Sequence, residues 1–227
     1  MKPAVVILFL IAMLLPACGI IQPAPTATQV PTNTPPPTQP ATEIPPTETQ
    51  IPTSTPIPGA SVLDFVASLC DAQWANGGQY LVPCPDVNAD HSGGYAVPLD
   101  PTSEGLPAGT PVLLTIPATN SYGGLFLRYP PITIHAGDRF STTLRCQSKA
   151  PCVVEYALEY FDSQGKYSRP FLAWNYRHGD PEVVVDSDLS KLAGQTVEFV
   201  LTLRPLYDAP QLDQTLWIAP YIYRPVP

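Results

Sequence analysis

Apolar side chains recur at every second position along the C-terminal part of the sequence, and this pattern restricts the fold more than any other feature. In CVVEYALEYF, residues 152–161, apolar residues alternate with positions that include two glutamates. Successive side chains of a β-strand point to opposite faces, whereas apolar positions on a helix recur every three or four residues. The segment is therefore predicted to be a half-buried strand. Its two faces carry Val154, Tyr156, Leu158 and Tyr160 on one side and Val153, Glu155, Ala157 and Glu159 on the other.

Two later segments, 196–204 and 215–224, alternate in the same way. In the first, the expected inward residues are Val197, Phe199, Leu201 and Leu203, opposite Thr196, Glu198, Thr202 and Arg204. In the second, the expected inward residues are Leu216, Ile218 and Ile222, opposite Trp217, Tyr221 and Tyr223. If the second face of this last strand is exposed, its aromatic rings form a stripe with steps of about 7 Å.

Five further short segments are strand candidates, and they read VLLTIP, GLFLRYPPITI, FSTTLRC, FLAWNY and EVVVD. Glycine, proline and aspartate separate them, and no long stretch shows helical periodicity. Short strands at this spacing are typical of two packed antiparallel sheets. The sequence therefore predicts an all-β domain with an antiparallel β-sandwich fold.

A segment rich in threonine and proline precedes these strands. Residues 22–59 contain no aromatic side chain and only two charged ones, Glu43 and Glu48. Such a segment cannot bury enough apolar surface to offset the entropy lost on ordering, and its prolines favour an extended polyproline II conformation. We therefore predict a disordered linker over residues 18–59 and a folded domain over residues 60–227.

The first 17 residues are predicted to be a signal peptide. Lys2 is followed by an uncharged apolar run over residues 4–15. This run is too short to span a bilayer, which takes about 20 residues. The sequence Leu15-Pro16-Ala17-Cys18 resembles the lipobox of bacterial lipoproteins. The resemblance implies removal of residues 1–17 and lipidation of Cys18, which anchors the chain to a membrane outside the cytoplasm.

The predicted domain is acidic. The chain has 19 acidic and 11 basic side chains, and all except Glu43, Glu48 and Lys2 follow residue 59, which leaves 17 acidic and 10 basic ones. No run of lysine or arginine occurs. We therefore expect no nucleic-acid partner.

With Cys18 assigned to lipid, four cysteines remain in the domain, and an even number in an oxidising compartment favours disulfide bonds. Three pairings are open. We expect Cys146–Cys152, because these residues end one predicted strand and open the next, and Cys70–Cys84, which closes a loop around Trp74. The cysteines form no Cys-x-x-Cys pair and have no neighbouring histidine, which disfavours a zinc site.

The stretch VVVDSDLSKLAGQTV is expected to form a short helical turn, capped by Ser187 or Asp188 and ended by Gly194 in a left-handed conformation. The same stretch is similar to a turn that precedes a late strand in many extracellular jelly-roll domains, among them galactose-binding-like domains and carbohydrate-binding modules. The matching residues are Asp188, Leu189, Ser190, Leu192, Ala193, Gly194, Gln195 and Val197. The resemblance implies a jelly-roll form of the β-sandwich.

Two places offer the chemistry of a sugar site, which combines a flat aromatic face with polar groups for hydroxyls. The first is FLAWNYRHGD, with Trp174, Asn175, Tyr176, Arg177 and Asp180; the second is the final strand, with Trp217, Tyr221 and Tyr223. The alternative is that these rings complete the core or cover a sheet edge.

A structural calcium ion is the one candidate cofactor. Asp86, Asn88 and Asp90 have the spacing that begins a calcium-binding loop, although His91 and Val97 stand where an EF-hand has glycine and glutamate. Asp and Asn are also common turn formers, so an ordinary turn is the alternative.

We predict a non-catalytic binding domain for an extracellular glycan or another component of the bacterial cell envelope. One alternative is a structural or protein-interaction domain of an envelope assembly. A second is a jelly-roll glycoside hydrolase that uses Glu155 or Glu159. These two lie about 13 Å apart on one strand, so either would need a partner such as Glu198.

Overall fold

The computed structural model describes residues 59–76, 81–82, 84, 93–118, 123–148, 150–207 and 213–226. They belong to one compact unit, Glu48–Pro227. The predicted signal peptide, the lipidation site Cys18 and the linker up to residue 58 lie outside these residues, as do the candidate calcium ligands Asp86, Asn88 and Asp90. The described part of the chain contains no helix that is both long and apolar enough to cross a membrane.

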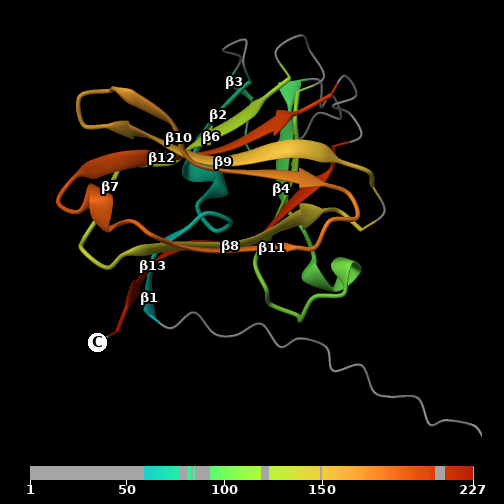
Figure 1. The fold of residues 1–227 in the computed structure, drawn as a ribbon, viewed down its shortest axis with the longest axis horizontal. Helices are drawn as coiled ribbons and strands as arrows, with labels where there is room; N and C mark the ends of the chain where they lie inside the picture. Colours follow the sequence, from blue (N-terminus) through green and yellow to red (C-terminus); the bar gives the residue numbers. More distant parts are fainter. Residues whose placement is uncertain are drawn as a thin grey trace, which may run out of the picture. The chain divides into compact units, whose positions relative to one another are not determined.

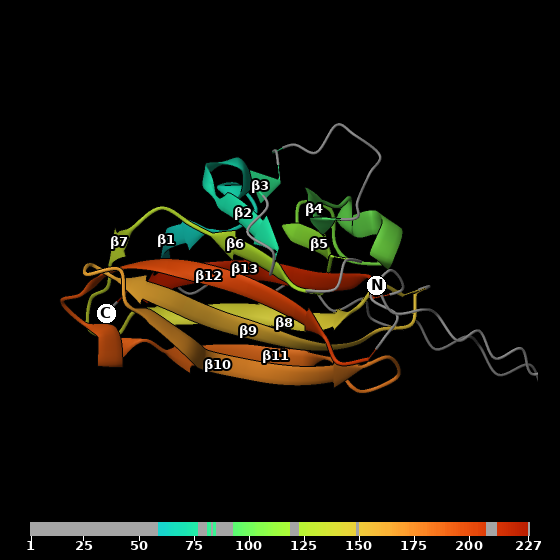
Figure 2. The same cartoon turned by 90° about the horizontal axis from the view of Figure 1, so that it is seen from above.

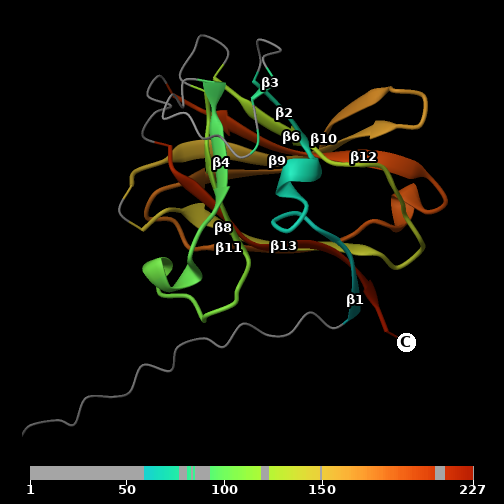
Figure 3. The ribbon, with the colours of Figure 1, turned by 180° about the vertical axis from the view of Figure 1, so that it is seen from behind.

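Two antiparallel sheets form a β-sandwich (Figure 1). Sheet A has the strand order β11-β8-β13-β5-β4, and β1 pairs with β13. Its strands are β1 (Gly59–Asp64), β4 (Tyr95–Pro98), β5 (Val112–Ile116), β8 (Arg139–Cys146), β11 (Val183–Asp188) and β13 (Thr215–Pro225). Figure 3 shows β1 beside the C-terminal part of β13, where Gly59 pairs with Pro225.

Sheet B has the order β10-β9-β12-β6-β2-β3, and β7 pairs with β12. Its strands are β2 (Gln73–Asn76), β3 (Leu81–Val82), β6 (Leu125–Arg128), β7 (Ile132–Thr133), β9 (Val153–Asp162), β10 (Tyr167–Arg177) and β12 (Thr196–Pro205). Short 3-10 turns are η1 (Leu69–Asp71), η3 (Pro101–Glu104) and η4 (Ser190–Leu192). From β10 to β13 the chain alternates between the sheets, and Figure 2 shows β12, β9 and β10 side by side. The predicted all-β sandwich is confirmed.

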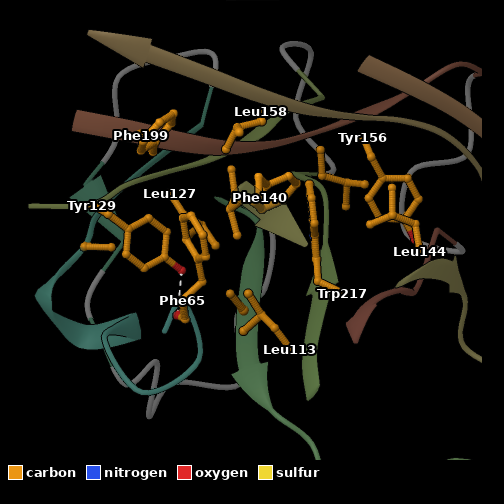
Figure 4. Packing of buried hydrophobic residues seen from close by; sticks show 14 of the residues in the cluster. Phe65, Leu113, Leu127, Tyr129, Phe140, Leu144, Tyr156, Leu158, Phe199 and Trp217 are labelled. Carbon is orange, nitrogen blue, oxygen red and sulfur yellow. Dashed lines mark hydrogen bonds between the residues drawn. The ribbon is translucent and has the colours of Figure 1, made fainter. Parts of the chain in front are cut away.

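The core lies between the two sheets (Figure 4). Phe140, Leu144 and Trp217 come from sheet A, and Tyr156 and Phe199 come from sheet B. The rings of Tyr156 and Trp217 meet edge to face with centroids 4.9 Å apart. Full burial of side chains of this size stabilises the fold by roughly 1.5–3 kcal/mol each, so this layer holds the sheets together.

The predicted inward faces of β9 and β12 are confirmed. Their buried residues in the core are Val154, Tyr156, Leu158, Val197, Phe199, Leu201 and Leu203, and Tyr160 packs against them partly buried. The opposite face is less exposed than its alternation predicts, because Ala157, Glu159, Val200 and Thr202 are also buried.

The predicted faces of the last strand are confirmed for Ile222, which lies in the core, and wrong for Leu216, Trp217 and Ile218. A bulge interrupts the pairing of β13 with β8 between Ile218 and Tyr221, and Ala219 has a positive φ of 49°. The bulge shifts the alternation, so Trp217 and Ile222 both point into the core while Leu216 and Ile218 pack on the outer side of sheet A.

Two disulfide bonds join Cys70 to Cys84 and Cys146 to Cys152, as predicted. They close loops of 14 and 6 residues, respectively. Loops of this size contribute about 2–3 kcal/mol each to stability in the chain-entropy account. Disulfide bonds persist in oxidising compartments, so they indicate an extracytoplasmic protein.

The predicted turn before β12 is also confirmed, as η4. The Asp188 carboxylate accepts a 2.8 Å hydrogen bond from the Ser190 amide, and Gly194 has a φ of 81°. Leu189 and Leu192 are buried in the core, which anchors the turn.

Candidate functional site

The outer side of sheet B carries a continuous set of charged and aromatic side chains. On β9, β12 and β6 these residues alternate with core residues, so they point away from sheet A. Those of β10 pair with the outward residues of β9, except Arg169, which lies where the register shifts between Ser168 and Leu172 and is included because it contacts the Tyr167 ring. Tyr207 is included because it contacts Arg177. We call this surface the sheet-B face. It comprises Glu155, Ala157, Glu159 and Phe161 of β9, Tyr167, Arg169, Asn175 and Arg177 of β10, Glu198, Val200, Thr202 and Arg204 of β12, Phe126 and Arg128 of β6, and Tyr207 after β12.

Strand register sets these residues in rows across the face. In one row Asn175 pairs with Glu155, and Glu155 pairs with Arg204. In another row Ala157 pairs with Thr202, which pairs with Phe126 of β6. Residues far apart in the chain therefore become neighbours, and small residues form the floor between larger ones.

Glu159 is the centre of the sheet-B face. Its buried carboxylate accepts hydrogen bonds from Thr202 Oγ1 at 2.8 Å, from Arg204 Nη2 at 2.7 Å and from the hydroxyl of Tyr167. Arg204 also donates through Nη1 to Glu155 Oε1 at 2.8 Å. One arginine thus bridges two carboxylates, and both ends of its guanidinium group are fixed.

Burial and these contacts shift the ionisation of the network. Burial and the bond to Glu159 raise the pKa of the Tyr167 phenol. Burial lowers the pKa of Arg204, but the hydrogen bond and charge of Glu159 and those of Glu155 outweigh it, so the pKa is raised overall. Tyr167 stays neutral and Arg204 stays charged throughout the physiological pH range.

Aromatic and charged groups also stack at one end of the sheet-B face. The rings of Phe161 and Tyr167 are nearly parallel, with centroids 4.5 Å apart. The guanidinium group of Arg128 lies 4.1 Å from the centroid of Phe161 and forms an ion pair with Glu198. A charge over an aromatic ring is favourable, so this end is rigid as well.

Tyr207 lies at the other end and is 63% exposed. It is the one aromatic residue among the large hydrophobic residues that the described chain exposes. Its hydroxyl lies 3.4 Å from Nη2 of Arg177, which donates to it. An exposed flat ring next to a hydrogen-bonding group is a suitable contact for a ligand.

The structure divides the first predicted sugar cluster between two faces. Trp174 and Tyr176 point between the sheets: the Trp174 ring lies 6.2 Å from that of Phe140, and Tyr176 is buried. Asn175 and Arg177 point outward and are exposed. Asp180 is exposed in the following turn, where its carboxylate accepts the backbone N–H of Arg177 at 3.1 Å.

The second predicted cluster does not form an exposed stripe. Trp217 is only 1% exposed in the core, and Tyr223 is 4% exposed with its hydroxyl bonded to Asp186 at 3.0 Å. Tyr221 is partly buried on β13. These three residues belong to sheet A, so the fold does not bring them to the sheet-B face.

The three glutamates of the hydrolase alternative all lie on the sheet-B face. Each is ion-paired with an arginine: Glu155 and Glu159 with Arg204, and Glu198 with Arg128. Glu159 is buried. The arrangement offers fixed hydrogen-bond donors and acceptors, which suits recognition of hydroxyl groups.

Several residues of the face were not among the predicted ligand contacts, namely Phe126, Arg128, Phe161, Tyr167, Arg169, Arg204 and Tyr207. The outward positions of β9 and β12 could have identified part of the set, because glutamate, threonine and arginine alternate there with the core residues. Tyr207 gives no such signal, since it follows a strand end.

Two other features bear on where a ligand could bind. Within the described residues, no group of three or more His, Cys, Asp or Glu side chains could hold a metal ion. A cavity of about 280 Å³ beside the Cys70–Cys84 bond is lined mostly by apolar side chains, including Val66, Leu69 and Val97. It lies apart from the sheet-B face.

No protein-family model and no curated protein match the sequence. Among solved structures, the chain is similar to TmCBM61 in complex with β-1,4-galactotriose, with 11% identity and a TM-score of 0.42 over 71% of this chain and 94% of that one. It is also similar to the CBM22-2 xylan-binding domain from Paenibacillus barcinonensis Xyn10C, with 13% identity and a TM-score of 0.37 over 71% of this chain and 96% of that one. A third similar structure is the C-terminal family 22 carbohydrate-binding module of Clostridium thermocellum Xyn10B. It has 13% identity and a TM-score of 0.39, over 74% of this chain and 95% of that one. At these scores the similarities establish neither a shared ligand nor a shared binding site.

Proposed function

We propose that this domain is a non-catalytic module that binds an extracellular glycan on the sheet-B face. The observation that carries the proposal is the combination of an exposed ring, Tyr207, with the fixed polar network of Glu155, Arg204 and Glu159 on one sheet surface. A sugar ring presents apolar C–H groups to an aromatic face and hydroxyls to charged donors and acceptors.

Preorganisation supports this reading. Arg204 and Arg128 are held by carboxylates, and Phe161 is stacked between Arg128 and Tyr167. Side chains that are already ordered lose little entropy when a ligand binds. The face can therefore bind a ligand that itself offers only weak individual contacts.

We further propose that the domain is displayed by a lipid anchor. In this proposal residues 1–17 are removed, Cys18 carries the lipid, and residues 18–59 form the linker to the domain of residues 60–227. Mass spectrometry of the mature protein should find a lipid-modified N-terminal Cys18. The variant Cys18→Ala should leave the membrane fraction, and an unmodified soluble wild-type protein would contradict the anchor.

Affinity measurements with a panel of polysaccharides test the binding proposal. Tyr207→Ala should weaken binding about tenfold, the loss expected for one good aromatic contact. Val184→Ala is the matched control, because Val184 is 77% exposed but lies on the edge strand β11 of sheet A. Equal effects of the two variants, or no binding across the panel, would contradict the proposal; the second outcome would favour an envelope-protein interaction.

A further inference from the structure

Two arginines on the sheet-B face differ from all others in the domain. All seven arginines of the sequence lie in the described residues. Five form ion pairs: Arg128 with Glu198, Arg139 with Asp186, Arg145 with Glu104 and Glu182, Arg204 with Glu155 and Glu159, and Arg224 with Asp138. Within the described residues, Arg169 and Arg177 have no carboxylate partner for their side chains.

Both of these arginines are exposed, and each lies beside a tyrosine. The guanidinium carbon of Arg169 lies 5.8 Å from the ring centroid of Tyr167. Nη2 of Arg177 lies 3.4 Å from the hydroxyl of Tyr207. A guanidinium group is weakly hydrated and planar, so an exposed one without a carboxylate partner is available to bind an anion.

The two arginines stand near opposite ends of β10. Ser168, next to Arg169, pairs with Tyr160, and Arg177 pairs with Val153. The span from position 160 to position 153 of β9 corresponds to roughly 23 Å of strand. The network of Glu155, Arg204 and Glu159 lies between the two ends.

The charge of the sheet-B face contrasts with the charge of the domain. The face carries four arginines and three glutamates, whereas the whole domain has 17 acidic and 10 basic side chains once Glu43, Glu48 and Lys2 are subtracted from the totals. Lys166, His178 and Asp180 flank it; the Asp180 carboxylate accepts the backbone N–H of Arg177. A net positive surface on an acidic domain favours an anionic ligand.

We propose that the glycan bound by the sheet-B face is an acidic polysaccharide whose carboxylate or sulfate groups are bound by Arg169 and Arg177. This inference rests on the proposed glycan-binding function of the face. Guanidinium groups bind such oxyanions with two parallel hydrogen bonds. Between the two arginines, the partly exposed side chains of Glu155 and Arg204 offer hydrogen-bonding groups to neutral hydroxyls.

The position of the glutamates also restricts the ligand. Glu155 and Glu198 are partly exposed on the same face. A nucleic acid carries a negative charge at every nucleotide, so its backbone would meet these carboxylates as well as the arginines. A polysaccharide with acidic groups on some of its sugars avoids this repulsion.

Matched polymers test the inference with the full-length protein. Partly methyl-esterified polygalacturonate carries carboxylates on some of its sugars, and the fully esterified polymer has the same backbone without them. Lightly sulfated dextran and unmodified dextran form the corresponding pair for sulfate. Neutral xylan, neutral galactan and double-stranded DNA complete the set. We expect a charged polymer to bind more tightly than its neutral counterpart, by about tenfold or more, with an affinity that falls as salt is added. The charged member that binds distinguishes carboxylate from sulfate.

Charge-removing variants identify the contacts. Arg169→Gln and Arg177→Gln should each raise the dissociation constant for the acidic polymer about tenfold, and the double variant should raise it further. Arg177→Lys should lose part of the affinity, because lysine keeps the charge without the planar fork. Lys191→Gln is the matched control, since it removes the same charge from the exposed turn η4.

The outcomes separate the two proposals. Equal binding of charged and neutral polymers would overturn the acidic-ligand inference and leave the glycan-binding function standing. Absence of binding to every polysaccharide would overturn both. DNA binding as tight as that of the best polysaccharide, or an equal loss in Lys191→Gln, would also overturn the inference, because the attraction would then reflect overall charge.

Discussion

The outer sides of the two sheets are used differently. On sheet A, Leu216 and Ile218 are buried beneath Leu99 and Leu106, which flank η3, the green coil below the sheet in Figure 1. Among the residues that the structure describes, none forms such a cover over the sheet-B face, where the side chains of the face form an ion-paired network. The comparison indicates that one outer side serves stability and the other is available for a ligand.

Arginine has a different role on each side. Arg145 holds the cover of sheet A, because it pairs with Glu104 at the end of η3, and the Glu104 carboxylate also accepts the Ser148 amide at 3.0 Å. On the sheet-B face, Arg204 joins two carboxylates that belong to a single strand, β9. An ion pair that holds a covering segment stabilises the fold, whereas one on an uncovered sheet leaves polar groups within reach of a ligand.

Leu216→Ala should have the largest effect on stability. Leu216 is fully buried on the covered side of sheet A, so its truncation leaves a cavity and should lower the free energy of unfolding by about 3–4 kcal/mol. Chemical denaturation measures the change, with Val184→Ala as the exposed control on the same sheet. A loss below about 1 kcal/mol would show that the cover does not pack on the sheet.

Glu159→Ala should have the second largest effect and lower the free energy of unfolding by about 2–3 kcal/mol. It removes the acceptor shared by Thr202, Tyr167 and Arg204 and leaves buried donors without a partner. Glu159→Gln keeps an acceptor and should cost less in the same denaturation experiment. If both variants were as stable as wild type, the network would not be formed in solution.

Glu104→Ala should lower the free energy of unfolding by about 1–2 kcal/mol, because the contacts with Arg145 and Ser148 are lost together. Glycan affinity should not change, since the sheet-B face is untouched. Chemical denaturation measures the loss of stability, and calorimetric titration with the glycan measures the affinity. An affinity loss as large as that of Tyr207→Ala would contradict the division of roles between the two sheets.

The smallest expected effect on stability is the one that pH exerts through Asp138. Burial opposes ionisation of Asp138, but the hydrogen bonds and charge of Arg224, together with the backbone N–H and charge of His135, outweigh it, so the pKa is lowered from its ordinary value of 3.8. Because the pKa is lower in the folded state, ionised Asp138 stabilises the fold at pH values above its ordinary pKa of 3.8. This stabilisation is lost as the pH falls through the folded-state pKa. Asp138→Asn should therefore flatten the acid side of a stability profile measured by thermal unfolding. An unchanged profile would exclude this pair as a source of acid sensitivity.

Local patterns in the sequence determined the strands and part of the site. Alternation correctly assigned the inward faces of β9 and β12, and the spacing of the cysteines led to the correct disulfide pairs. The hydrogen bond from the Ser190 amide to Asp188 and the left-handed Gly194 were also recognisable, because both depend on nearby residues. Signal peptide, lipid anchor and calcium site stay predictions.

Tertiary structure decided the rest. The bulge in β13 breaks the alternation between Ile218 and Tyr221, so a strict period of two that correctly places Ile222 in the core puts Trp217 and its neighbours on the wrong faces. The pairing of Arg204 with Glu159 joins positions 45 residues apart, and Tyr207 meets Arg177 across 30 residues. A period of two fixes which side of its own strand a residue occupies, but strand order and register fix its neighbours, and those neighbours make the sheet-B face.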